Sequence, residues 1–165
     1  MKNYLSNVLI YVAALCGIIA FIGLFATPLQ SFDSIHGTWS SYNIRAYLGD
    51  GKIGAYKGTV FPIFGYIIPL LMSIFLIVES FKPSLDKRVA FINTVLAILY
   101  FFSAILVLLT KELWLKANDL GETDLIRNGW GPIMAAISSC AAGILLLIVS
   151  WMPGRRKKIN YIETH

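Results

Sequence analysis

Four long stretches of this chain carry no charged side chain, and each is long enough to cross a lipid bilayer as a helix. They cover residues 5–26, 60–78, 89–109 and 131–151. A helix rises about 1.5 Å per residue, so about 20 residues cover the roughly 30 Å hydrocarbon core of a membrane. Buried helices of a soluble protein would need other elements to cover them, and these stretches leave little else in the chain. The sequence therefore predicts an all-α integral membrane protein, built as a bundle of four transmembrane helices.

The composition fits a single membrane domain. Of the 165 residues, 57% are hydrophobic and 14% are charged, whereas a soluble domain averages about 25% charged residues. Residues 1–165 are expected to form one domain, with external loops at 27–59 and 110–130, a short turn at 79–88 and a tail at 152–165. The first stretch is too long for a signal peptide and lacks a small-residue cleavage site, so we interpret it as an uncleaved anchor.

The distribution of charge predicts the orientation. The segments 1–4, 79–88 and 152–165 together hold eight basic and three acidic residues, a net charge of +5. The two loops on the other side hold six of each sign, and three of their basic residues lie in the long first loop. Basic residues close to the ends of spans stay in the cytoplasm. We therefore expect a multi-pass protein of the plasma membrane with its N- and C-termini in the cytoplasm.

Small residues recur at helical spacing in the first and fourth stretches. In lipid, such stripes let helix backbones approach closely, because van der Waals packing replaces the hydrophobic drive between helices. We expect the first and fourth helices to pack against each other through these stripes, and a contact with a second copy is the alternative. The candidate helix-packing residues are Ala13, Gly17, Ala20, Ala135, Ser139 and Gly143.

The first external loop is predicted to contain a small β-hairpin. Residues 42–48 alternate in character, Gly49-Asp50-Gly51 follows as a turn signal, and a second short run covers residues 52–56. The loops are also rich in aromatic residues, which either form an interfacial belt or anchor a protein contact. The candidate partner contacts are Trp39, Tyr42, Tyr47 and Trp114.

A basic cluster follows the fourth stretch directly. Arg155, Arg156, Lys157 and Lys158 are candidates for contact with anionic lipid, since each base near such a surface contributes about 1 kcal/mol. The alternative is a plain stop-transfer anchor. Four bases beside a membrane are a poor basis for nucleic-acid binding, so the expected partners are the lipid bilayer and either a protein partner or a second copy.

The sequence offers little chemistry. No ionisable Asp, Glu, Lys, Arg or His lies inside the four stretches, which argues against an ion-coupled carrier. The two cysteines, Cys16 and Cys140, lie inside the stretches and are interpreted as packing residues. Asp33 and His36 are three residues apart in the first loop, and they are the candidate acid–base pair for catalysis. We predict no catalytic residue, no metal site and no cofactor.

The layout resembles that of the claudin-type tetraspan proteins: four spans, cytoplasmic termini, a larger first external loop with β character and a smaller second loop. The resemblance covers topology alone. The first loop of that family has a Trp followed by Gly-Leu-Trp and paired cysteines, whereas this chain has Gly37-Thr38-Trp39 and no loop cysteine. The resemblance implies an arrangement of elements and no particular activity.

Three functions follow as hypotheses. The first is a non-enzymatic subunit, scaffold or accessory factor that acts through helix packing and its outer loops. The second is an oligomeric pore or small-solute carrier, favoured by Pro69 inside a span and by Asn93 and Thr94. The third is a membrane enzyme with a site around Asp33 and His36. The first hypothesis is preferred.

Overall fold

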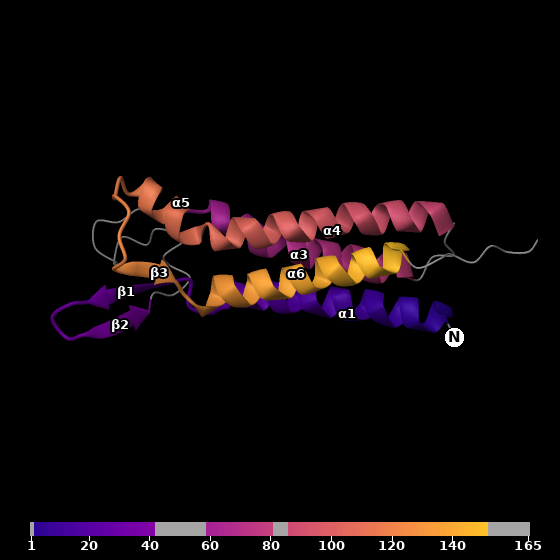
Figure 1. The fold of residues 1–165 in the computed structure, drawn as a ribbon, viewed down its shortest axis with the longest axis horizontal. Coiled ribbons are helices and arrows are strands. Elements are labelled where there is room, and N and C mark those ends of the chain that lie inside the picture. Colours follow the sequence, from indigo (N-terminus) through magenta and orange to yellow (C-terminus); the bar gives the residue numbers. More distant parts are fainter. Residues whose placement is uncertain (1, 42–58, 81–85, 152–165) are drawn as a thin grey trace, which may run out of the picture.

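A computed structural model describes residues 2–41, 59–80 and 86–151 of the chain. Its four long helices run side by side along one axis (Figure 1). They are α1 (Lys2–Ile22), α3 (Phe61–Ser80), α4 (Asp86–Leu108) and α6 (Trp130–Trp151). All four are long and apolar enough to cross a membrane. The prediction of four apolar helices is confirmed, with ends that differ by a few residues from the charge-free stretches.

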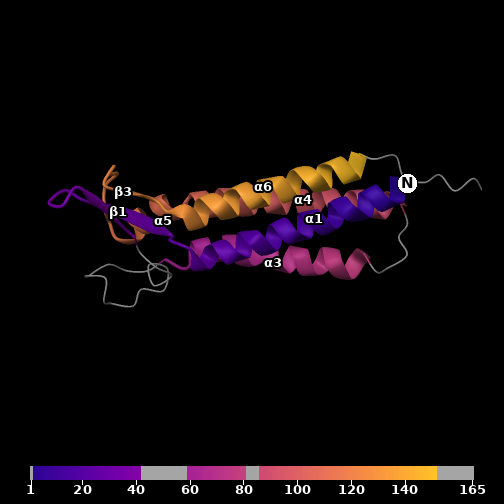
Figure 2. The ribbon, with the colours of Figure 1, turned by 90° about the horizontal axis from the view of Figure 1, so that it is seen from below.

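The helices form a ring in which each one packs against two neighbours. The packed pairs are α1 with α3, α3 with α4, α4 with α6, and α6 with α1. The chain passes up and down the bundle, so the start of α1 and the end of α6 lie at the same end (Figures 1 and 2). We call the end of the bundle that holds the start of α1 and the end of α6 the terminal end. The strands and the short helix α5 (Thr110–Ala117) gather at the opposite end, which we call the sheet end.

The sheet end is a three-stranded antiparallel sheet. Its strands β1 (Leu29–Asp33), β2 (Thr38–Ser41) and β3 (Ile126–Asn128) lie in the order β2-β1-β3. Strands β1 and β2 belong to the loop after α1, whereas β3 belongs to the loop before α6. The pairing of β1 with β3 therefore joins the two loops into one unit.

The hairpin predicted over residues 42–56 lies outside the described residues. The described part of the same loop forms another antiparallel pair, in which Phe32 stands opposite Trp39 and Asp33 opposite Thr38. This segment begins directly after Pro28 and has too few residues to show a clear alternation of apolar and polar side chains. The fold is thus mostly helical with a small sheet, and the sheet draws on both loops.

Burial in the bundle is the reverse of that in a soluble protein. The outward faces of the four helices carry large apolar side chains, such as Leu71, Phe102 and Ile137, each more than half exposed. The buried positions include hydroxyl and amide side chains: Ser73, Asn93, Ser103, Thr110 and Ser139. Water would not favour this distribution, because it leaves apolar surface wet and removes polar groups from solvent.

Candidate functional site

The small residues of the first and fourth stretches lie inside the bundle but meet different neighbours. Ala13, Ala20, Ala135 and Ser139 are fully buried. Gly23 approaches Gly131 and Ala135, so α1 and α6 do come close near the sheet end. Gly17, however, faces α3 and α4, where a side chain would collide with the Pro69 carbonyl, and Gly143 faces Phe101 and Ala97 of α4. The two stripes therefore share buried clusters, Ala13 with Ala142 and Ala20 with Ala135, as predicted, while Gly17 and Gly143 face the other two helices.

A cluster of polar groups lies in the middle of the bundle and joins its helices through hydrogen bonds. Pro69 lies inside α3 and has no backbone N–H, so the Gly65 carbonyl loses its usual partner in the helix. Ser103 of α4 supplies a donor, because its hydroxyl lies 2.5 Å from the Gly65 carbonyl oxygen. Residues 61–80 form one helix through the proline. The proline thus leaves a carbonyl of α3 free to accept a hydrogen bond from α4.

A second pair of bonds lies one turn further along α3. The Ser73 hydroxyl donates to the Pro69 carbonyl at 2.8 Å. The Tyr100 hydroxyl lies 3.0 Å from Ser73 Oγ and also donates to the Pro69 carbonyl at 3.4 Å. Both side chains are fully buried beside Gly17. Three helices therefore meet through hydroxyl groups and backbone, with no charge, which suits an apolar surrounding.

The sheet rests on a small apolar core of its own. Leu29 of β1 and Ile126 of β3 point to the same side, and Leu29 is 1% exposed. They pack on Trp114 and Leu115 of α5. Trp114 packs against the sheet and is only 4% exposed. It therefore offers little surface to a partner. Asn128 fastens the same region, since it accepts the Lys111 N–H at 3.0 Å and donates to the Leu108 carbonyl at 2.7 Å.

The opposite face of the sheet carries an ordered row of side chains. Arg127 stacks on the ring of Trp39, with its guanidinium carbon 3.8 Å from the ring centroid. Its Nε donates to Gln30 Oε1 at 2.9 Å. Trp39 also packs on Phe32, with ring centroids 5.3 Å apart. Each of the three strands contributes to this row, which we call the outer face.

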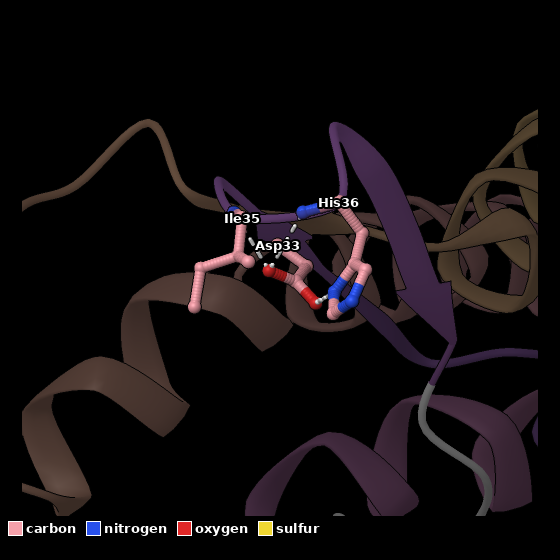
Figure 3. Close-up of polar contacts among 3 residues, drawn as sticks. All are labelled: Asp33, Ile35 and His36. Atoms are coloured by element: carbon pink, nitrogen blue, oxygen red, sulfur yellow. Dashed lines mark hydrogen bonds and ion pairs between the residues drawn. The ribbon is translucent and has the colours of Figure 1, made fainter.

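The β1–β2 turn carries the acid–base pair. His36 Nδ1 lies 2.6 Å from Asp33 Oδ2, and the other carboxylate oxygen accepts the Ile35 N–H at 2.9 Å (Figure 3). These bonds, with that from His36 first, hold the pKa of the Asp33 carboxyl below its ordinary value. Gly37 follows with φ of +63°, a conformation that glycine adopts easily. The carboxylate therefore shapes the turn.

This arrangement offers little to a reaction. The His36 side chain is 72% exposed and that of Asp33 is 37% exposed, and the pair lies at the β1–β2 turn (Figure 3). Catalysis by an acid–base pair draws on a site that excludes water and aims both groups at a substrate. In residues 2–41, 59–80 and 86–151, no group of three or more His, Cys, Asp or Glu side chains could hold a metal ion.

Some residues predicted from the sequence lie outside the described part of the chain, and two residues of the outer face were not predicted. Tyr42, Tyr47 and the basic cluster Arg155, Arg156, Lys157 and Lys158 lie outside the described residues. Trp39 lies on the outer face. Gln30 and Arg127 were overlooked, because a strand of three residues gives no periodic signal and the two residues are 97 positions apart. The short alternation Ile126-Arg127-Asn128 was the one available hint.

Comparison of the chain with protein-family models, with curated proteins and with solved structures finds no match.

Proposed function

We propose that this chain is a multi-pass protein of the plasma membrane that acts without catalysis, as a subunit, scaffold or accessory factor. Its helices sit in the bilayer, its termini lie in the cytoplasm, and its sheet stands outside. The sheet makes the functional contact with a protein partner or a second copy.

The reversed burial of the bundle is the observation that supports a location of the four helices in the membrane. Apolar side chains cover the outward faces of all four helices, while hydroxyl groups lie inside, and those of Ser73 and Ser103 donate to backbone carbonyls. Lipid favours both features, because it solvates apolar surface and leaves polar groups to find partners within the protein. The length of α6 agrees, since 22 residues span about 33 Å and each end carries an exposed tryptophan, Trp130 and Trp151.

The pore alternative receives less support. Pro69 and Asn93, which motivated it, are buried inside the bundle, and the Thr94 hydroxyl donates to the Ala90 carbonyl of its own helix. The outward faces available for lining a pore between copies are apolar in α3, α4 and α6. Such a lining would not hold water or ions readily.

The contact role follows from the sheet. Pairing between β1 and β3 joins the two loops, and two exposed apolar residues border the sheet. Ile35 at the hairpin tip is 88% exposed and Leu125 is 53% exposed. These two side chains are the anchors that we assign to the protein contact.

The test is to solubilise the protein from its native membrane in mild detergent and to measure the mass of the complex. The expected result is a stoichiometric complex that Ile35→Ser weakens, because the substitution removes apolar surface without touching the fold. Ser34→Ala, in the same turn, is the matched control and should leave the complex intact. A monomer that carries no partner would contradict the contact role, and recovery of the chain in the soluble fraction would contradict the membrane role.

A further inference from the structure

We propose that Arg127 on the outer face is a preoriented binding site for one carboxylate group of a partner protein. The inference rests on the proposed contact role of the sheet and names the chemistry that the partner must bring. Three observations support it: the fixed position of the guanidinium group, its free donors and the charge of the surrounding face.

The Arg127 side chain is held from two sides. The Trp39 ring holds the guanidinium group from one side, with the guanidinium carbon 3.8 Å from the ring centroid. The bond from Nε to Gln30 Oε1 holds it from a second side. The amide of Gln30 is itself oriented, since its Nε2 donates to Ser41 Oγ at 3.4 Å. An exposed arginine normally loses considerable side-chain entropy on binding, and here much of that cost has been met within the fold.

The two terminal nitrogens keep donors for a ligand. A guanidinium group has five N–H donors, and the Nε–H is the one that bonds to Gln30. Within the described part of the chain, no carboxylate forms an ion pair with Arg127. The fork of two terminal nitrogens matches the two oxygens of a carboxylate, which such a fork binds in bidentate fashion.

The surrounding face favours a carboxylate over a phosphate. Arg127 is the one basic residue in strands β1, β2 and β3. A single positive charge matches the single negative charge of an aspartate or glutamate side chain. A phosphate group carries up to two charges and is usually bound by several cations. Trp39 and Phe32 beside the fork would pack against the aliphatic part of an acidic side chain.

The test uses the purified full chain in lipid nanodiscs and a small probe, an aspartate capped at both ends so that its side chain is its one charge. The probe is titrated while the ¹⁵N signal of Arg127 Nε–H is followed by NMR, and capped asparagine and inorganic phosphate are titrated in parallel. The expected result is saturable binding of capped aspartate, with weaker binding of both other probes.

Two variants separate the geometry from the charge. Arg127→Lys keeps the charge and loses the fork, and its affinity, followed by the backbone amide of the same residue, should fall about tenfold. Trp39→Leu frees the guanidinium group and should weaken binding, whereas Trp39→Phe keeps a ring and should restore most of it. Lys116→Gln removes a distant exposed charge of the same sign and is the matched control.

Three outcomes would overturn the proposal: equal affinity in wild type and Arg127→Lys, tighter binding of phosphate, or no saturable binding of capped aspartate by the wild type. Binding that appears only after Asp50→Asn would show that a carboxylate of this chain occupies the fork. Because the probe is a small molecule, a negative result leaves the co-purification experiment unaffected, and a missing partner there leaves this one unaffected.

Discussion

At the scale of the residue, Pro69 illustrates how a local defect becomes a tertiary contact. A proline inside a helix removes one hydrogen bond, and in lipid no water replaces it. The Ser103 hydroxyl takes that place by donating to the Gly65 carbonyl. Gly65 also allows the approach, because a side chain there would collide with Val107 of α4. Pro69, Gly65 and Ser103 therefore act together in joining α3 to α4.

This unit predicts a dependence between two substitutions. Ser103→Ala should lower the free energy of unfolding by about 1 kcal/mol, since the Gly65 carbonyl is left without a donor. In a Pro69→Ala background the residue at 69 regains its N–H and can bond to Gly65, so the cost of Ser103→Ala should shrink. A double-mutant cycle, measured by denaturant unfolding in micelles, checks this. Equal costs in both backgrounds would show that the Ser103 bond is independent of the proline.

At the scale of the element, the β1–β2 hairpin depends on one carboxylate. Asp33 accepts bonds from His36 and from the Ile35 backbone, which favours its ionised form in the folded turn. A group whose pKa is lowered on folding adds stability above its unfolded pKa and loses that contribution as the pH falls through its folded pKa. The order of the hairpin should therefore be complete above about pH 4 and decline below it.

The corresponding measurement is an NMR titration of the Asp33 carboxyl. Its pKa should lie below that of an unstructured aspartate, and His36→Ala should raise it, because the imidazole bond is the largest cause of the shift. A pKa of Asp33 that does not change in His36→Ala would place the cause in the backbone bonds alone.

At the scale of the whole molecule, the two ends of the bundle differ in a way that a topology experiment can detect. The terminal end carries the chain start and the end of α6, whereas the sheet end carries all three described strands (Figure 1). A bilayer around the four helices would place these ends in different compartments. The excess of basic residues in segments 1–4, 79–88 and 152–165 predicts that the terminal end faces the cytoplasm.

Cysteine labelling in intact cells checks the assignment. Ser34→Cys, in the exposed hairpin turn, should react with a membrane-impermeant maleimide without cell lysis. Ser84→Cys, in the segment 79–88 that the sequence assigns to the cytoplasm, should react only after lysis. The two native cysteines are part-buried within the helices, so the unsubstituted chain is the control for background labelling. The opposite pattern would reverse the orientation, and labelling of both sites in intact cells would exclude a spanning bundle.

The local sequence was enough to determine the four apolar helices, because hydropathy acts residue by residue and each span satisfies its own backbone bonds. It was also enough to indicate a charge-free interior and a polar sheet end. Tertiary structure alone decided which residues meet. The pairing of β1 with β3, the burial of Trp114 beneath them and the stacking of Arg127 on Trp39 each join segments far apart in the chain. Such contacts have no periodic signature, since they depend on where the helices bring the two loops.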